Sequence, residues 1–159
     1  MAGIETFRVN EKWDVDVVIY FDCCYVLADN RLLTTRQWAS WCRNCQTVVA
    51  AECIQTVAEI DEELRQLSDP SDKIHKCFSR RTIEEWLQED RVRLEWLRTR
   101  KAPARCLECE KTDVVHIDSS DFVDAVSGTR IKNISTGHAS MVHEIRRRLT
   151  SEGMLIEVH

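Results

Sequence analysis

The sequence contains little glycine and proline and no long apolar run, and these absences exclude several classes of protein. Only 4 glycines and 2 prolines occur among 159 residues, which leaves little room for flexible linkers or an elaborate glycine-rich phosphate loop. No apolar run approaches the roughly 20 residues that a membrane-spanning helix needs. Residues 1–10 include Glu5 and lack the apolar core of a secretory signal, so we expect a cytoplasmic protein with no membrane partner.

The signatures of several common hydrolases are absent as well. The chain has no G-x-S-x-G nucleophile turn, no H-E-x-x-H helix and no pair of carboxylates at a recognisable catalytic spacing. We therefore assign no catalytic or cofactor-binding residues under the favoured interpretation, which is that of a non-catalytic protein. The question of enzymatic activity stays open.

Charge is distributed unevenly along the chain. The net charge of −5 argues against indiscriminate binding to nucleic acid. Residues 1–72 hold 6 basic and 13 acidic side chains, whereas residues 73–159 hold 16 and 14. The basic excess gathers in residues 91–105 and again in residues 146–148. The basic side chains of the first group are Arg91, Arg93, Arg98, Arg100, Lys101 and Arg105. This basic helix face, residues 91–105, is where we expect a protein or nucleic-acid partner; the alternative is an ordinary solvated helix face.

The chain has 8 cysteines, which we expect to be reduced thiols in an intracellular protein. Four of them form two Cys-x-x-Cys pairs, Cys42 with Cys45 and Cys106 with Cys109. A tight turn aims both thiols of such a pair at one metal ion, and four thiolates complete the tetrahedral shell that Zn²⁺ prefers. The favoured prediction is one shared zinc site that fastens the N-terminal part of the chain to the C-terminal part.

The long separation of the two pairs leaves other arrangements open. About 60 residues lie between the pairs, whereas compact zinc modules place theirs about 15–20 apart. In a two-site alternative, Cys23 or Cys24 joins the first pair and His116 or His138 joins the second pair. In a third alternative the chain binds no metal and its cysteines pack as small apolar residues.

Apolar periodicity predicts two helices. The stripe through Val49, Cys53, Val57, Ile60, Leu64 and Leu67 has a helical spacing and predicts a long helix that begins at or just after Cys42–Cys45. A capping box at Thr82 and Glu85 predicts the start of a second helix, which ends before Pro103. The loop at residues 68–72 separates them, so we expect an antiparallel helical hairpin.

Strand patterns flank the two helices. Alternation predicts a strand over residues 13–21, and β-branched runs predict strands at 114–117 and 154–158. Residues 122–126 and 129–134 flank a hairpin turn at Ser127-Gly128. A short helix is expected after His138 and through Leu149. The whole is an α+β fold: a helical hairpin with N-terminal strands and a small antiparallel C-terminal sheet, stapled by zinc. We expect one domain, 1–159, with possible sub-units 1–102 and 103–159.

The segment from Arg105 to Ile117 resembles the first knuckle and strand of zinc-ribbon proteins. It places Cys106-Leu107-Glu108-Cys109 at a turn ahead of a β-branched run. Zinc ribbons mostly bind nucleic acid or protein and are not themselves catalytic, so the resemblance implies a binding or scaffolding part. The chain departs from that family because no second cysteine pair follows Cys109.

The same region is similar to HNH nucleases in the order of its ligand-type residues. The matching residues are Cys106, Cys109, His116, Asn133 and His143. The resemblance implies that His116 activates water, Asn133 orients it and His143 helps to hold a divalent ion. In that family Asp or His usually precedes the first His, where this chain has Val115. The family's second cysteine pair after the Asn is also missing.

A third resemblance concerns Trp41-Cys42-Arg43-Asn44-Cys45, which is similar to the Trp-Cys-x-x-Cys motif of thioredoxin-like oxidoreductases. It implies that the pair opens a helix, whose N-terminus lowers the pKa of the first thiol, and that the pair exchanges disulfides. That family also needs a cis-proline, and neither Pro70 nor Pro103 precedes a convincing strand.

Overall fold

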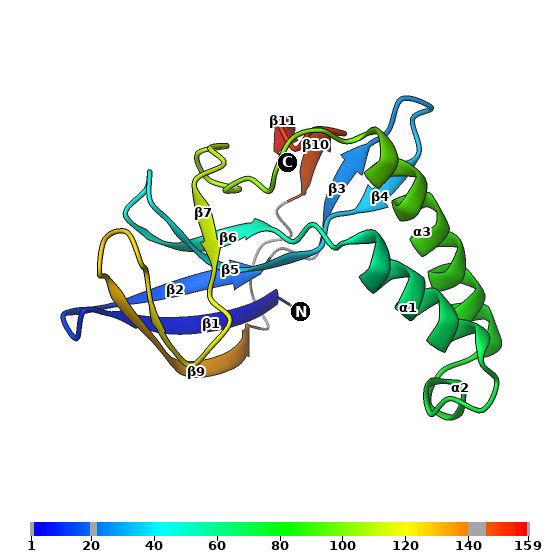
Figure 1. Ribbon diagram of the computed structural model, residues 1–159, viewed down its shortest axis with the longest axis horizontal. Coiled ribbons are helices and arrows are strands. Elements are labelled where there is room, and N and C mark those ends of the chain that lie inside the picture. The colour runs from blue at the N-terminus through cyan, green and yellow to red at the C-terminus, as the bar shows by residue number, and fades with distance from the viewer. Residues whose placement is uncertain (1, 20–21, 140–145, 159) are drawn as a thin grey trace.

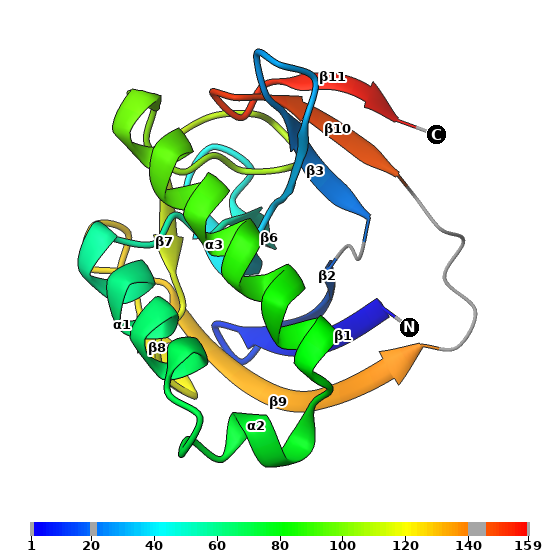
Figure 2. The same cartoon turned by 90° about the vertical axis from the view of Figure 1, so that its right-hand side faces the viewer.

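The computed structural model describes residues 2–19, 22–139 and 146–158. Within these ranges the chain forms three β-sheets and a group of helices. Figure 1 shows the helices gathered on one side of the molecule, and Figure 2 shows the longest of them crossing in front of the strands. Each sheet combines strands from both sides of residue 102.

The first sheet is antiparallel, with its strands in the order β2-β1-β9-β8. Their bounds are β1 Ala2–Val9, β2 Trp13–Ile19, β8 Asp121–Val123 and β9 Arg130–Ala139. The predicted alternation is confirmed over residues 14–17 of β2, where Val17 is buried and Asp16 is exposed. Trp13, predicted on the same face as Val17, is exposed. The predicted hairpin around Ser127-Gly128 is also confirmed, as β8 and β9 pair across it. Gly128 has a φ of 69°, which glycine adopts without strain.

The second sheet mixes parallel and antiparallel pairs in the order β11-β10-β3-β4. Its strands are β3 Cys23–Val26, β4 Leu32–Thr34, β10 Arg147–Thr150 and β11 Leu155–Val158. Strand β10 runs parallel to β3, and the residues that pair between the two strands are far apart in sequence. Cys23 is buried and Cys24 is half-buried, as expected when adjacent residues of a strand face opposite sides.

The third sheet is small and positions the cysteines. Its order is β6-β5-β7, with β5 Gln37–Cys42, β6 Thr47–Glu52 and β7 Val114–His116. Strand β5 is central, and it pairs antiparallel with β6 on one side and with β7 on the other. The strand predicted at 114–117 is thereby confirmed.

The helical part is shorter at its start than we predicted. The helices are α1 Val57–Ser68, α2 Ile74–Cys77 and α3 Arg80–Thr99. The prediction of a helix from Cys42–Cys45 onward was wrong, because residues 37–52 form the β5–β6 hairpin. A capping box at Thr56 and Glu59 starts α1 instead. The predicted cap at Thr82 was also misplaced, since Ser79 caps α3 and accepts a hydrogen bond from the Thr82 amide.

Helices α1 and α3 pack together, with α2 in the connection between them. The hairpin of helices is therefore present, but it is one part of a molecule in which sheets dominate. Cys53, which we placed on the helix, lies in the segment between β6 and α1 and is buried.

The separate C-terminal sheet that we predicted does not form. Strands β8 and β9 join the N-terminal strand β1, and strands β10 and β11 join β3. The predicted short helix after His138 was wrong at both ends, because β9 continues to Ala139 and Leu149 lies in β10. Its centre, residues 140–145, lies outside the described residues.

Candidate metal centre

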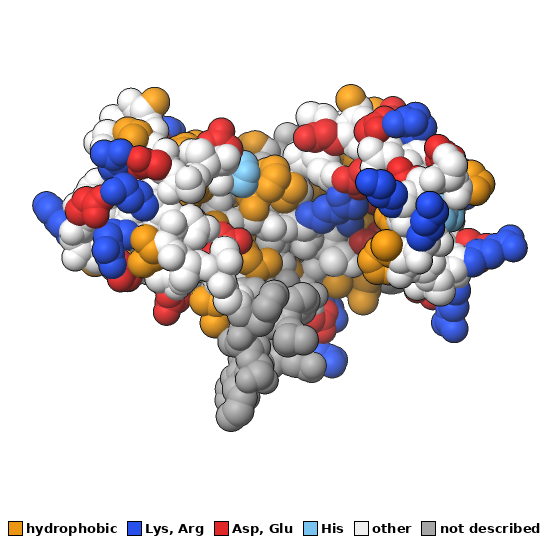
Figure 3. Space-filling model, turned by 90° about the horizontal axis from the view of Figure 1, so that it is seen from below, with side chains coloured by type: hydrophobic (Ala, Val, Ile, Leu, Met, Phe, Trp, Pro, Cys, Tyr) orange, Lys and Arg blue, Asp and Glu red, His pale blue; other side chains and the backbone are white. Residues whose placement is uncertain are grey.

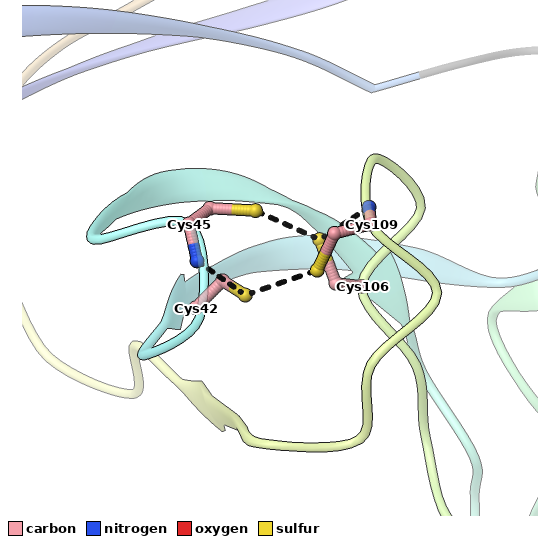
Figure 4. Close-up of side chains that lie close together, drawn as sticks. All are labelled: Cys42, Cys45, Cys106 and Cys109. Atoms are coloured by element: carbon pink, nitrogen blue, oxygen red, sulfur yellow. Dashed lines mark hydrogen bonds between the residues drawn. The ribbon is translucent and has the colours of Figure 1, made fainter.

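Four cysteines meet beside the third sheet (Figure 4). The sulfur atoms of Cys42, Cys45, Cys106 and Cys109 all lie within 4.8 Å of one another. The Cys42 and Cys109 sulfurs are 3.7 Å apart, and the Cys45 and Cys106 sulfurs are 3.9 Å apart. Cys42 and Cys106 are buried, whereas Cys45 and Cys109 are half-buried. The cluster brings together residues that are 61 and 67 positions apart in sequence.

The spacing of the sulfurs fits one tetrahedral metal ion. A Zn–S bond is about 2.3 Å long, so the sulfurs of a regular tetrahedral site lie about 3.8 Å apart. The Cys42–Cys109 and Cys45–Cys106 distances bracket that value. A set of four thiolates is also the donor set that soft, tetrahedral ions favour, and it leaves no position for water or substrate. The residues present therefore fit zinc, although the geometry alone does not identify the ion.

The first knuckle is the turn of the β5–β6 hairpin. Cys42 ends β5, pairing with Thr47 across the hairpin and with Val114 of β7. The backbone amide of Arg43 donates to the Asp113 carbonyl at 3.0 Å. The guanidinium of Arg43 holds Asp124, with a shortest distance of 2.6 Å. The turn that carries the first two thiols is thus fixed to β7 and to the β8–β9 hairpin.

The second knuckle lies in the loop between α3 and β7, against the outer edge of β6. Cys106 forms an isolated antiparallel bridge with Ala51. The Leu107 amide donates to the Ala50 carbonyl at 3.1 Å. Arg147 of β10 donates to the Leu107 carbonyl and pairs with Glu108 at 3.1 Å. Strands β6 and β10 therefore set the position of this knuckle.

The two knuckles have the same backbone geometry. The residue after the second cysteine has a positive φ in each, 55° at Gln46 and 60° at Glu110. Each of these residues donates its amide to the carbonyl of the first cysteine, at 2.8 Å in the first knuckle and 3.0 Å in the second. Glycine is the usual residue for that conformation. Because neither turn has glycine at this position, the positive φ could not be predicted from the sequence.

Backbone amides point at the sulfur atoms of Cys42 and Cys106 and can stabilise the negative charge of a thiolate there. The amides of Glu108 and Cys109 lie 3.3 and 3.4 Å from the Cys106 sulfur, and the Cys45 amide lies 3.4 Å from the Cys42 sulfur. Amide donors stabilise a thiolate, while burial opposes it.

The thiols of Cys45, Cys106 and Cys109 differ in the direction of their pKa shifts. Burial raises the pKa of Cys106 to about 12 and also raises that of Cys45. Burial acts in the same direction on Cys109, but the Lys111 amide and the neighbouring thiols outweigh it and lower its pKa to about 7. Because metals bind thiolates, uptake of an ion must release the remaining protons.

A buried ion pair anchors the chain where it returns to the cluster. Arg100 donates to both carboxylate oxygens of Glu52, at 2.9 and 2.8 Å, and the two side chains are 2% and 0% exposed. The Arg105 amide donates to the same carboxylate at 2.8 Å. The Glu52 amide in turn donates to the Arg105 carbonyl at 3.0 Å. Glu52 thus ties the end of α3 and the residue before Cys106 to the end of β6.

The other candidate ligands lie elsewhere. Cys23 and Cys24 are in β3 and belong to no metal-type cluster within the described ranges. His116 stacks on Trp38 with ring centroids 3.7 Å apart, and its Nδ1 is buried without a hydrogen-bond partner among the described residues. The side chain of His138 lies outside the described residues, as does His143.

The structural context of the two enzyme-type resemblances is only partly present. The pair Cys42–Cys45 lies in a hairpin turn, so the predicted helix N-terminus is not there. No cis peptide bond occurs in the described part of the chain. For the nuclease resemblance, Asn133 lies in β9 and its side-chain amide donates to Glu5 at 3.4 Å.

Part of the basic helix face is not at the surface. The Arg93 side chain is 3% exposed and pairs with Glu89, and Arg100 is held by Glu52. Arg91, Arg98 and Lys101 remain exposed. Sequence periodicity did not distinguish the buried arginines from the exposed ones, because a buried arginine and a solvated one can lie one helical turn apart.

Comparisons with known proteins add no family. A scan against protein-family models, a search of curated proteins and a search of solved structures found no match. In the part of the chain that the structure describes, no helix combines the length and apolarity needed to cross a membrane.

Proposed function

We propose that this chain is a zinc-stabilised, non-catalytic binding protein in which one zinc ion joins the two cysteine knuckles. The observation that supports it is the convergence of four thiols at separations that suit one tetrahedral ion. Such a site has no open coordination position, so its role is structural. The two knuckles beside a three-stranded sheet support a zinc-ribbon type of centre, with the helices inserted between its halves.

The experiment is metal analysis by mass spectrometry on protein purified without added metal, together with thiol titration. We expect about one zinc per chain and four thiols protected until a chelator is added. Cys45→Ser and Cys109→Ser should each abolish zinc binding, because they empty the same site. Cys77→Ser, at an exposed cysteine outside the cluster, is the matched control. Two zinc ions per chain, a variant pair with unequal effects, or freely titrating thiols would contradict the shared site.

A tetrathiolate site can also hold a single iron ion. A protein that holds iron in such a site is coloured, whereas one that holds zinc there is colourless. The absorption spectrum therefore separates the two. A colourless protein with stoichiometric zinc supports the proposal, and a coloured one with stoichiometric iron replaces zinc by iron.

For the partner we propose a protein segment with acidic side chains that contacts the exposed residues Arg91, Arg98 and Lys101. Glu95 lies between them on α3 with a side chain 66% exposed, which disfavours a uniformly anionic nucleic-acid backbone. On the face drawn in Figure 3, basic and acidic side chains are likewise interspersed. An acidic protein segment of this kind should bind to the wild-type protein and should not bind to the R91E/R98E variant. The control is R80E/R81E, at the other end of the same helix.

A further inference from the structure

A cavity of about 340 Å³ lies between the three helices and β4, and none of the four clustered cysteines lines it. Its volume falls in the range of small-molecule sites, which begins at about 300 Å³. Leu67, Ile74 and Trp86 contribute apolar surface, and Glu63 and Glu89 lie beside them. The two glutamate side chains are each 35% exposed, so carboxylates can be reached from solvent.

The charged lining favours a cation. Two guanidinium groups, those of Arg36 and Arg93, face three carboxylates. Arg36 is fully engaged, with Glu63 at 2.8 Å and Asp90 at 2.9 Å. Arg93 pairs with Glu89 at 2.8 Å. Because the carboxylates outnumber the arginines, one negative charge is left over and an added anion would be repelled.

One donor in the lining has no acceptor. The Nε of Arg93 is buried without a hydrogen-bond partner in the described part of the chain, and the Arg93 side chain is 3% exposed. The Asp90 carboxylate oxygen is 3.8 Å from this Nε, which is too far for a hydrogen bond. A buried donor without a partner costs about 1–3 kcal/mol. An acceptor atom of a ligand would satisfy it.

The aromatic part of the lining suits an organic cation. Trp86 is half-buried, and Phe78 packs against it edge-on with ring centroids 4.8 Å apart. An indole ring next to carboxylates is a favourable place for an ammonium group, because the ring face is negative and the carboxylates add to the attraction. Burial raises the pKa of Asp90 and lowers that of Arg93, so these two groups lie on the poorly hydrated side of the cavity.

We propose that this cavity binds a small organic monocation that also carries one carbonyl oxygen and an apolar group, the chemistry of an amino-acid amide. The ammonium group lies between Glu63 and Glu89, near Trp86. The carbonyl oxygen accepts from Arg93, and the apolar group packs on Leu67 and Ile74. This binding is independent of the metal centre.

Four matched probes test the proposal on the whole 159-residue chain, with any metal that it holds after purification. They are L-phenylalaninamide, phenethylamine without the carbonyl, neutral N-acetyl-L-phenylalaninamide and anionic N-acetyl-L-phenylalanine. Titration at pH 7 is followed by the indole N–H signal of Trp86 in nuclear magnetic resonance spectra. We expect L-phenylalaninamide to bind at least about tenfold more tightly than the neutral analogue. Phenethylamine should bind with intermediate affinity and the anion most weakly.

Variants locate the binding. Glu89→Gln should weaken L-phenylalaninamide at least about fivefold, whereas Glu84→Gln, at an exposed glutamate on the same helix that pairs with Arg80, should not. Gln66→Lys keeps an exposed position on α1 and supplies a tethered ammonium at the cavity, which should block the probe even if Glu89→Gln fails to fold. Equal binding of the anion, no movement of the Trp86 signal with any probe, or full binding to Gln66→Lys would overturn the proposal.

Discussion

The buried ion pair between Glu52 and Arg100 offers a quantitative test of how the chain is held at the cysteine cluster. Glu52 accepts two hydrogen bonds from Arg100 and one from the Arg105 amide. Arg100→Met leaves a fully buried carboxylate with one donor of three. Removing one partner of a buried pair costs about 3–5 kcal/mol. We therefore expect a loss of about 3.5 kcal/mol at pH 7.

Urea denaturation at pH 7 measures this loss of stability, with Arg98→Met, at an exposed position near the end of α3, as the control. The melting temperature should fall by about 10 °C. A loss below about 1 kcal/mol would refute the reasoning about this pair.

Three further outcomes are expected. Gly153 has a φ of 80°, and a Cβ there would lie 2.4 Å from Glu52 Oε1, so Gly153→Ala should cost about 2 kcal/mol or more in urea denaturation. The Arg43 guanidinium, and then Ser127, hold the pKa of Asp124 well below its usual range. Because the folded pKa is depressed, the stabilisation is present above about pH 4 and is lost as pH falls; Asp124→Asn should therefore lower the melting temperature at pH 6 more than at pH 3. A chelator should lower the melting temperature of the wild-type protein but leave that of Cys45→Ser unchanged, since that variant has no metal to lose.

The local turns were more predictable from the sequence than the contacts that unite them. Each Cys-x-x-Cys pair indicates its own knuckle, because two thiols at that spacing fit one turn. Nothing in the spacing showed that the two turns would meet, since the meeting depends on Glu52 and on the bridge between Ala51 and Cys106. The four sulfurs do come together, and their binding of a metal stays a prediction.

The errors in the helices have an identifiable cause. Residues 47–52 form a short apolar run that fits either a buried strand or the first turns of a helix, and periodicity alone cannot separate the two. The deciding signal was Thr56 with Glu59 three residues later, a capping box that begins α1 well after Val49. Strands β8, β9 and β11 were predicted nearly in place, whereas the segment of β10 was predicted as helix. The pairings of β9 with β1 and of β10 with β3 join positions more than a hundred residues apart in sequence, where local patterns carry no information.

The position of the cysteine cluster in the chain path explains why a metal ion would matter here. The chain leaves the third sheet at Glu52, forms the three helices, and returns beside the same residue at Arg105. The helical segment therefore leaves and rejoins the third sheet at one place, where the cluster also lies. Without an ion the second knuckle is held by Glu52, by Arg147 and by one backbone bridge. An ion bound by all four thiols would close a loop of about 60 residues, which constrains the unfolded chain as well as the folded one. Loss of the ion should therefore loosen the second knuckle before it disturbs the helices or the sheets.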